Sequence, residues 1–138
     1  MPTSALPHSL PGVVDVSIVR GAACPEGARP DLLVEVPHGA TRTTDFTGLA
    51  ALLESPLPPS LVDFFHVNTD IGAFELGEAA AHRFVAGAPT RSVVLLRCRI
   101  PRTFIDCNRR LNATPEEFKA GGVTPGLMPW ITAPADRA

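Results

Sequence analysis

The run SVVLLRCRI at 92–100 constrains the fold more strongly than any other segment of this chain. Its four consecutive aliphatic residues, bounded by charge, indicate a strand that is buried on both faces. DLLVEVP at 31–37 is likewise apolar on both faces apart from Glu35, which is typical of a central strand covered by helices. VVDVSIV at 13–19 has the valine and isoleucine density of a third strand. The chain therefore needs helices to cover its sheet.

Helical patterns alternate with these strands. The segment 46–55 has helical spacing and ends before Pro56, and a short helix with Ser60 as its cap follows two more prolines. Residues 71–86 place Ala73, Leu76, Ala80 and Phe84 along one face at the helical period. The aromatic and β-branched segment 64–70 predicts a further strand or extended segment. This alternation predicts an α/β fold, with a mixed, mainly parallel sheet flanked by helices.

The length of 138 residues fits one domain, which can bury about 70% of its unfolded surface. Residues 1–12 contain three prolines and are expected to form a flexible leader ahead of an α/β domain at 13–118. Near the end of that domain, Thr114 and Glu117 predict the capping box of a short helix. Residues 119–138 are expected to form an irregular tail, because they show no hydrophobic periodicity.

Composition and charge argue against several classes of protein. The chain has 12 basic and 14 acidic residues, so it lacks the basic excess on which nucleic-acid binding depends. No apolar run approaches the roughly 18 to 20 residues that span a bilayer, which argues against a membrane protein. The three cysteines are too few, and odd in number, for a disulfide framework, and this fits a reducing, cytoplasmic location.

Two potential metal ligands follow predicted elements at the edge of the sheet. Ligands of open α/β sheets gather beyond the carboxyl ends of the strands, and His38 directly follows the segment 31–37. A neutral imidazole at this position could bind zinc, act as a general base, or simply hydrogen-bond a neighbouring loop. Asp70 lies where the segment 64–70 gives way to a helix, so its carboxylate could either bind a metal or cap that helix.

Five of the 12 basic residues, all of them arginines, lie between positions 97 and 110. A guanidinium pairs two donors with a carboxylate, so this concentration after a buried strand predicts a pocket for an acid. Asn108 would add a neutral amide donor to that pocket. Asp106 is expected to orient Arg102 or Arg109 rather than to react.

Three segments that carry these residues together resemble the N-formylglutamate amidohydrolase family. They are VPHGAT (36–41), NTDIGAFELGEA (68–79) and RIPRTFIDCNRRL (99–111), in the family's order and at plausible spacing. The matching family segments are a Pro-His-Ser/Gly-Gly loop, an Asp-led helix start and an Arg-x-x-x-Asp-x-Asn-Arg block. The resemblance extends from about Val13 to Leu111, and its last block is the most specific part.

The resemblance implies a fold similar to that of the zinc carboxypeptidases, and hydrolysis of the amide bond in an N-acyl amino acid such as N-formylglutamate. It implies that His38 and Asp70 are metal ligands, with zinc as the expected cofactor. Asn108 and Arg109 would hold the carboxylate of the small-molecule substrate, with Arg102 as a further anion contact. Zinc would polarise the amide carbonyl and lower the pKa of its bound water to about 7.

Two departures from the family pattern limit that expectation. The carboxypeptidase relatives have an acidic residue three positions after the first histidine, where this chain has Thr41. The family's later metal histidine, in an Asp-x-His-Ser segment, and its acidic general base would fall beyond residue 138. Catalytic zinc normally has three protein ligands. The sequence therefore resembles the amino-terminal half of the family, and no catalytic residue is assigned to it.

Two further hypotheses follow from these departures. One is a non-catalytic, amidohydrolase-like half domain that binds an acidic small molecule. The other is a half-fold that needs a partner chain, because a sheet cut in mid-domain has an unpaired edge and exposed apolar surface. A homo-oligomer is one way in which such an edge could be covered.

Overall fold

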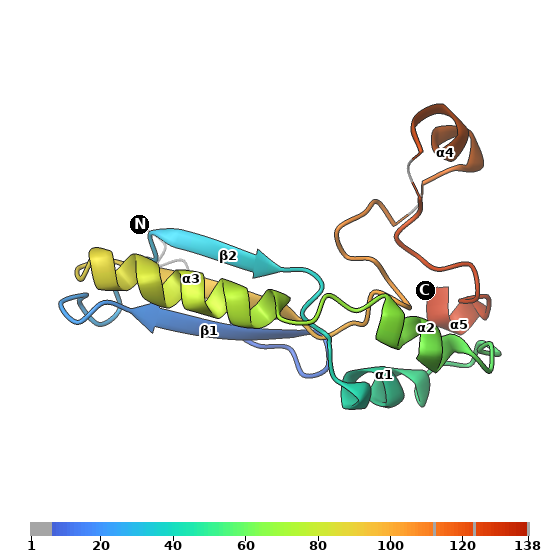
Figure 1. Cartoon of the computed structure of the whole chain (residues 1–138), viewed down its shortest axis with the longest axis horizontal. Coiled ribbons are helices and arrows are strands. Elements are labelled where there is room, and N and C mark those ends of the chain that lie inside the picture. The colour runs from blue at the N-terminus through green and yellow to red at the C-terminus, as the bar shows by residue number, and fades with distance from the viewer. Residues whose placement is uncertain (1–6, 112, 123, 138) are drawn as a thin grey trace.

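The computed structural model describes residues 7–111, 113–122 and 124–137. Within these ranges, three strands form one mixed sheet in the order β1-β3-β2 (Figure 1). The strands are β1 (Val14–Arg20), β2 (Leu32–Val36) and β3 (Ser92–Cys98). β3 runs antiparallel to β1 and parallel to β2, so the sheet has one pairing of each kind. The predicted α/β class and the mixed sheet are confirmed, whereas the expectation that the sheet is mainly parallel is not.

The central strand is β3, which has the longest uninterrupted apolar run of the three. The expectation that the segment 31–37 is a central strand is wrong, because β2 lies at the edge of the sheet. Val93, Val94 and Leu95 are each at most 4% exposed. Val93 pairs with Val19 of β1 on one side and with Leu32 of β2 on the other, so it has a neighbour on both edges. The predicted buried strand is therefore confirmed.

One face of the sheet is covered by α3 (Ala73–Gly87), which confirms the predicted helix at this position (Figure 1). Ala81 and Val85 of this helix pack against Val93 of the central strand. A Cβ atom at Gly77 would lie 3.0 Å from a valine methyl group of β2, so glycine allows the helix to approach the sheet closely. Close packing of this kind fixes the position of the helix start next to the end of β2.

A second hydrophobic cluster lies beyond the end of the sheet and contains aromatic rings from three segments. Phe46 stands between Phe65 and Phe104, with ring centroids 5.2 Å and 5.0 Å away. Leu61 and Ile131 are the other buried members of the cluster. Two of the segments are helices, α1 (Thr43–Ala50) and α2 (Leu61–Val67) (Figure 1).

The predicted strand or extended segment at 64–70 is wrong, because α2 occupies most of it. Leu61 and Phe65 lie one helical turn apart and are at most 4% exposed, so both bury the same face of the helix. Burial of this face in the aromatic cluster outweighs the β propensity of the neighbouring aromatic and β-branched residues. The short helix predicted after the prolines is confirmed, with Ser60 at its N-cap position.

The start of α1 is set by an ion-pair network around Asp45. The helix begins at Thr43, three residues before its predicted start. The buried Asp45 carboxylate accepts the backbone N–H of Arg42 at 3.2 Å and the Nε–H of Arg99 at 3.1 Å. Arg99 Nη1 also donates to Asp15 of β1 at 2.7 Å, so one guanidinium ties the helix to the sheet. Arg99 lies 54 positions from Asp45 in the chain, so the local sequence around the helix does not indicate this contact.

The predicted capping box is confirmed at the start of α4 (Pro115–Gly121). The backbone N–H of Glu117 donates to Thr114 Oγ1 at 3.2 Å, and the Thr114 N–H donates to the Glu117 carboxylate at 2.8 Å. These reciprocal bonds satisfy two helix-end donors. Among the described residues, no helix is long and apolar enough to cross a membrane.

The segment expected to be an irregular tail is held against the aromatic cluster by specific contacts. Trp130 Nε1 donates to the Thr103 carbonyl at 2.9 Å, and Ile131 is 3% exposed. Near its end, Asp136 of α5 (Pro134–Arg137) accepts the Ser55 backbone N–H at 2.8 Å. The described part of 119–138 therefore contributes to the core.

The predicted leader at 1–12 is described only from residue 7 onwards, and residues 1–6 lie outside the described residues. Ser9 Oγ accepts the backbone N–H of Val16 at 2.8 Å. Leu10 exchanges backbone hydrogen bonds with Val14, which lies at the start of β1. Residues 9 and 10 therefore fold back along the first strand.

Candidate functional site

His38 is placed by a tight loop at the carboxyl end of β2. A Cβ atom at Gly39 would lie 2.6 Å from Arg97 Cγ and 3.0 Å from the Cys98 carbonyl oxygen, so this close approach requires glycine. Arg97 Nε donates to the Gly39 carbonyl at 2.8 Å, and its guanidinium lies 4.5 Å from the centre of the Phe74 ring. The loop is thereby fixed between β3 and the start of α3, with His38 at its turn.

The imidazole of His38 lies between two carboxylates. Its Nδ1 is 2.7 Å from Asp70 Oδ2, and its Nε2 is 2.8 Å from Asp106 Oδ1. Carboxylates only accept hydrogen bonds, so both contacts are hydrogen bonds only when both ring nitrogens carry protons. Alternatively, a cation can replace the proton between His38 and Asp70. The Asp70 side chain is 45% exposed, whereas that of Asp106 is 2% exposed, so a cation reaches the Asp70 side more easily.

Asp106 is the buried centre of this cluster. In addition to His38, its carboxylate accepts Arg109 Nε–H at 2.8 Å and the Asn108 backbone N–H at 3.0 Å, and Arg102 Nε lies 3.3 Å away. Burial raises the pKa of Asp106, but the hydrogen bonds from His38, Arg109 and Asn108 outweigh it and leave the pKa below its usual value. Asp106 is therefore ionised at neutral pH and holds its three side-chain partners in place.

Arg102 joins the two carboxylates, because its Nη1 also lies 3.5 Å from Asp70 Oδ1. We define the His38 cluster as His38, Asp70, Arg102, Asp106 and Arg109. Two carboxylates balance two guanidinium groups, so the cluster has no net charge when His38 is neutral. A metal cation and an anionic ligand bound together would preserve this balance better than either would alone.

The cluster contains four of the five site residues predicted from the sequence: His38, Asp70, Arg102 and Arg109. The fifth, Asn108, has an exposed side chain beside the cluster, and its backbone N–H binds Asp106. Asp106 pairs with both arginines, in agreement with its expected orienting role. Its contact with His38 was not predicted from the sequence.

The capping alternative for Asp70 is wrong. The N-cap of α3 is Gly72, which lies two residues later, and the Asp70 carboxylate contacts His38 and Arg102 instead. The contacts of His38 with two carboxylates suit a metal ligand, a general base and a hydrogen-bonded loop histidine alike.

Three of the five clustered arginines have structural partners outside the site. Arg97 is bonded to the Gly39 carbonyl, Arg99 joins α1 to the sheet, and Arg110 Nη1 lies 2.5 Å from Glu117. The concentration of arginines therefore indicated the correct region of the chain. Which members face the site depends on contacts that the local sequence does not reveal.

An open groove of about 310 Å³ runs between β2 and α3 and ends at His38 and Asp70. Its walls are mostly apolar, although Glu35 also lines it, and its polar end consists of His38 and Asp70. A ligand with an apolar body and a polar head would match this combination. The groove's apolar lining comes from Val34, Val36, Leu76, Gly77 and Ala80.

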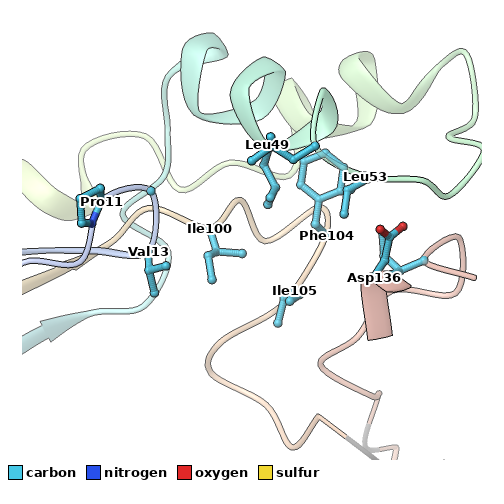
Figure 2. Close-up of a pocket in the computed structure, with 11 residues that line it drawn as sticks. Pro11, Val13, Leu49, Leu53, Ile100, Phe104, Ile105 and Asp136 are labelled. Carbon is cyan, nitrogen blue, oxygen red and sulfur yellow. The ribbon is translucent and has the colours of Figure 1, made fainter. Parts of the chain in front are cut away.

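A separate cavity of about 280 Å³ lies on the side of the aromatic cluster, as Figure 2 shows. Leu49, Ile100 and Phe104 contribute to its apolar lining. Its acidic member, Asp136, already accepts hydrogen bonds from the backbone N–H and the hydroxyl of Ser55 at 2.8 Å and 2.5 Å. The residues of the His38 cluster do not line this cavity, so we place the candidate chemistry in the groove instead.

The His38 cluster provides part of a metal site. His38 and Asp70 could supply two ligands, while Asp106 would hold the other imidazole nitrogen, as carboxylates commonly do beside metal-bound histidines. In the described part of the chain, no group of three or more His, Cys, Asp or Glu residues is placed to hold a metal ion. The donors therefore fit zinc chemically but fall short of the usual three protein ligands.

Comparisons of this chain with protein-family models, with curated proteins and with solved structures gave no match. Inference about function therefore depends on the His38 cluster and the groove beside it. The cluster combines a potential metal ligand with arginines that can bind an acid, and the groove reaches it at His38 and Asp70.

Proposed function

We propose that this chain is a metal-dependent hydrolase of the amide bond in N-acyl amino acids, such as N-formylglutamate, with a zinc carboxypeptidase-like fold. The supporting observation is that His38 contacts Asp70, 32 residues away, and Asp106, 68 residues away. These contacts join the three segments on which the family resemblance rests. The proposed setting is the cytoplasm, since the three cysteines are free.

The proposed metal-binding end of the site consists of His38 and Asp70. When bound there, zinc would supply a Lewis acid for the amide carbonyl and a water molecule of lowered pKa. The protein's own contribution is to hold the imidazole: Asp106, 2% exposed, fixes the ring from the opposite side. A rotation of the half-exposed Asp70 carboxylate would open a place for the ion between the two side chains.

The proposed acid-binding end consists of Arg102, Asn108 and Arg109. Each guanidinium has five N–H donors. Arg109 uses Nε for Asp106 and Nη1 for Thr124, while Arg102 lies at ion-pair distance from Asp106 and Asp70. The arginine side chains are 27% and 36% exposed, so other donors can reach a substrate carboxylate. The exposed amide of Asn108 lies next to them in the chain. An N-acyl amino acid has the required carboxylate within a few bonds of its amide.

A second function is supported by the incomplete ligand set: binding of an acidic small molecule without hydrolysis. In this alternative, the guanidinium groups alone recognise the acid, and His38 only supports Asp106. The exposure of Leu33 on the edge strand β2, at 52%, supports a further variant in which a partner chain or a second copy completes the sheet.

Zinc binding and hydrolysis test the proposal together. The purified chain should bind about one zinc per molecule and release formate from N-formyl-L-glutamate. His38→Ala should abolish zinc binding, whereas His82→Ala, on α3 outside the cluster, should retain it. Far less than one equivalent of zinc on the unaltered chain would overturn the metal-dependent hydrolase.

Acid binding separates the two functions. Arg109→Ala should weaken binding of N-formyl-L-glutamate at least about 30-fold, because it removes a partly buried charged partner. Arg110→Ala is a matched control, since this neighbour pairs with Glu117 instead. If His38→Ala leaves acid binding intact while Arg109→Ala removes it, the non-catalytic alternative holds. If both variants lose it, that alternative fails.

A further inference from the structure

Cys98 and Cys107 bring their sulfur atoms within 3.5 Å of each other. Cys98 is the last residue of β3, and Cys107 lies in the loop that follows Asp106. Cys107 is exposed and Cys98 is partly buried, so a small solute can reach the pair. A disulfide needs the two sulfurs to approach by about 1.5 Å more, which a small shift of this loop would provide.

The two thiols differ in acidity. The hydrogen bond with Cys107 lowers the pKa of Cys98 to about 6, and the same contact raises the pKa of Cys107. Cys98 is therefore the more acidic of the two thiols and forms a thiolate more readily than Cys107. A thiolate beside a second thiol is the arrangement in which an oxidised cysteine is resolved to a disulfide.

We propose that Cys98 and Cys107 form a modification site at which a hydroperoxide oxidises the two thiols to an intramolecular disulfide. The Cys98 sulfur attacks the terminal peroxide oxygen, the O–O bond breaks, and an alcohol leaves after taking up a proton. Cys98 is then a sulfenic acid, oxidised by two electrons. The Cys107 sulfur attacks the Cys98 sulfur, an S–S bond forms, and water leaves with the Cys107 proton. Two thiols and one hydroperoxide thus give one disulfide, one alcohol and one water.

The position of this pair gives the modification a structural consequence. Cys107 lies between Asp106 and Asn108, so the disulfide would tie the loop that carries Asp106 to the end of β3. Thiol reductants would reverse it. Transient disulfides of this kind occur in reducing compartments as redox sensors. The proposal is independent of the hydrolase function, because it needs neither a metal nor a substrate.

Cys24 is a built-in control for the test. It is a free thiol outside the pair, and its sulfur lies 3.7 Å from the Pro25 carbonyl oxygen. The full chain is treated with one equivalent of hydrogen peroxide, the free thiols are alkylated, and the peptides are mapped by mass spectrometry. We expect a disulfide between Cys98 and Cys107, with a loss of about 2 Da, while Cys24 is alkylated. Cys24→Ser should give the same result.

The intermediate is tested with Cys107→Ser, which removes the resolving thiol. In this variant, dimedone should label a sulfenic acid on Cys98, and the disulfide should be lost. The proposal is overturned if the unaltered chain keeps both thiols reduced, if Cys24 is oxidised as fast as Cys98, or if the disulfide joins two chains. Mapping of the unaltered chain decides this even if a variant does not fold. None of these measurements depends on hydrolysis.

Discussion

Replacing Asp106 with asparagine tests whether one buried carboxylate organises the His38 cluster. Its Oδ1 faces two donors, His38 Nε2 at 2.8 Å and the Asn108 N–H at 3.0 Å. Its Oδ2 also faces two, Arg109 Nε at 2.8 Å and Arg102 Nε at 3.3 Å. Asp106→Asn replaces one carboxylate oxygen with an NH₂ group, which only donates hydrogen bonds. Whichever oxygen it replaces, the NH₂ group then faces the two donors that this oxygen accepted.

The expected loss of stability follows from these contacts. A hydrogen bond to a charged group contributes about 1.5 to 3 kcal/mol, and breaking a buried ion pair costs about 3 to 5 kcal/mol. Arg102 and Arg109 are 27% and 36% exposed, so water offsets part of this loss. We expect Asp106→Asn to lower the free energy of unfolding by about 3 kcal/mol. In a domain of this size, that corresponds to a fall in Tm of roughly 10 °C.

Urea and thermal unfolding, followed by circular dichroism at pH 7, would measure this loss. Asp63→Asn, at an exposed position in the first turn of α2, is the control and should change the free energy by less than about 1 kcal/mol. The folded pKa of Asp106 lies below its ordinary value of 3.8, so its stabilising contribution is present above that pH and is lost as the pH falls through the folded pKa. The difference between Asp106→Asn and the unaltered chain should therefore shrink below about pH 4.

A melting temperature for Asp106→Asn within about 2 °C of the Asp63→Asn value at pH 7 would refute this reasoning. It would mean that the donors around Asp106 find other acceptors at little cost. The cluster would then not be a preorganised site.

Two substitutions measured by chemical denaturation test the packing that positions the site. Gly39→Ala should destabilise the fold by about 1 to 3 kcal/mol, because the new Cβ would lie 2.6 Å from Arg97 Cγ. The control Gly48→Ala, in open space on α1, should be neutral or stabilising. Equal effects of the two substitutions would contradict the close approach at Gly39. Phe104→Ala should lower the free energy of unfolding by about 3 to 5 kcal/mol, because Phe104 is 1% exposed. Phe64→Ala should lower it clearly less, because Phe64 is 41% exposed. The reverse order would show that the aromatic cluster is not a core.

The strands and the long helix could be predicted from the sequence because their signals are local. The apolar run of β3 and the helical period of 71–86 need no knowledge of distant residues. The predicted apolar face of that helix is wrong, because Leu76 is 72% exposed and the buried residues are Ala81 and Val85. The second half of α2, from residue 64, was predicted as a strand or extended segment because the buried face of the helix is defined by packing of Leu61 and Phe65 against other segments. Its local composition, rich in aromatic residues, favours the opposite conclusion.

The sequence predicted which residues form the candidate site better than it predicted which contacts they make. His38 was identified because it follows the strand β2, whereas Asp70 was identified from an expected extended segment at 64–70 that is mostly helical. The hydrogen bond from His38 to Asp106 joins residues 68 positions apart and has no counterpart in local spacing. Similarly, Arg97 turned out to be a structural residue only because Phe74 and the Gly39 carbonyl lie beside it.

The central claim is that His38 and the arginines form one site for a metal and an acid. The most direct test is calorimetric titration of the chain with N-formyl-L-glutamate, with and without one equivalent of zinc. Because bound zinc would add positive charge beside the arginines, zinc should tighten acid binding by at least about 10-fold, a coupling of about 1.4 kcal/mol. His38→Ala should remove this coupling. Equal affinities with and without zinc in the unaltered chain would contradict the claim.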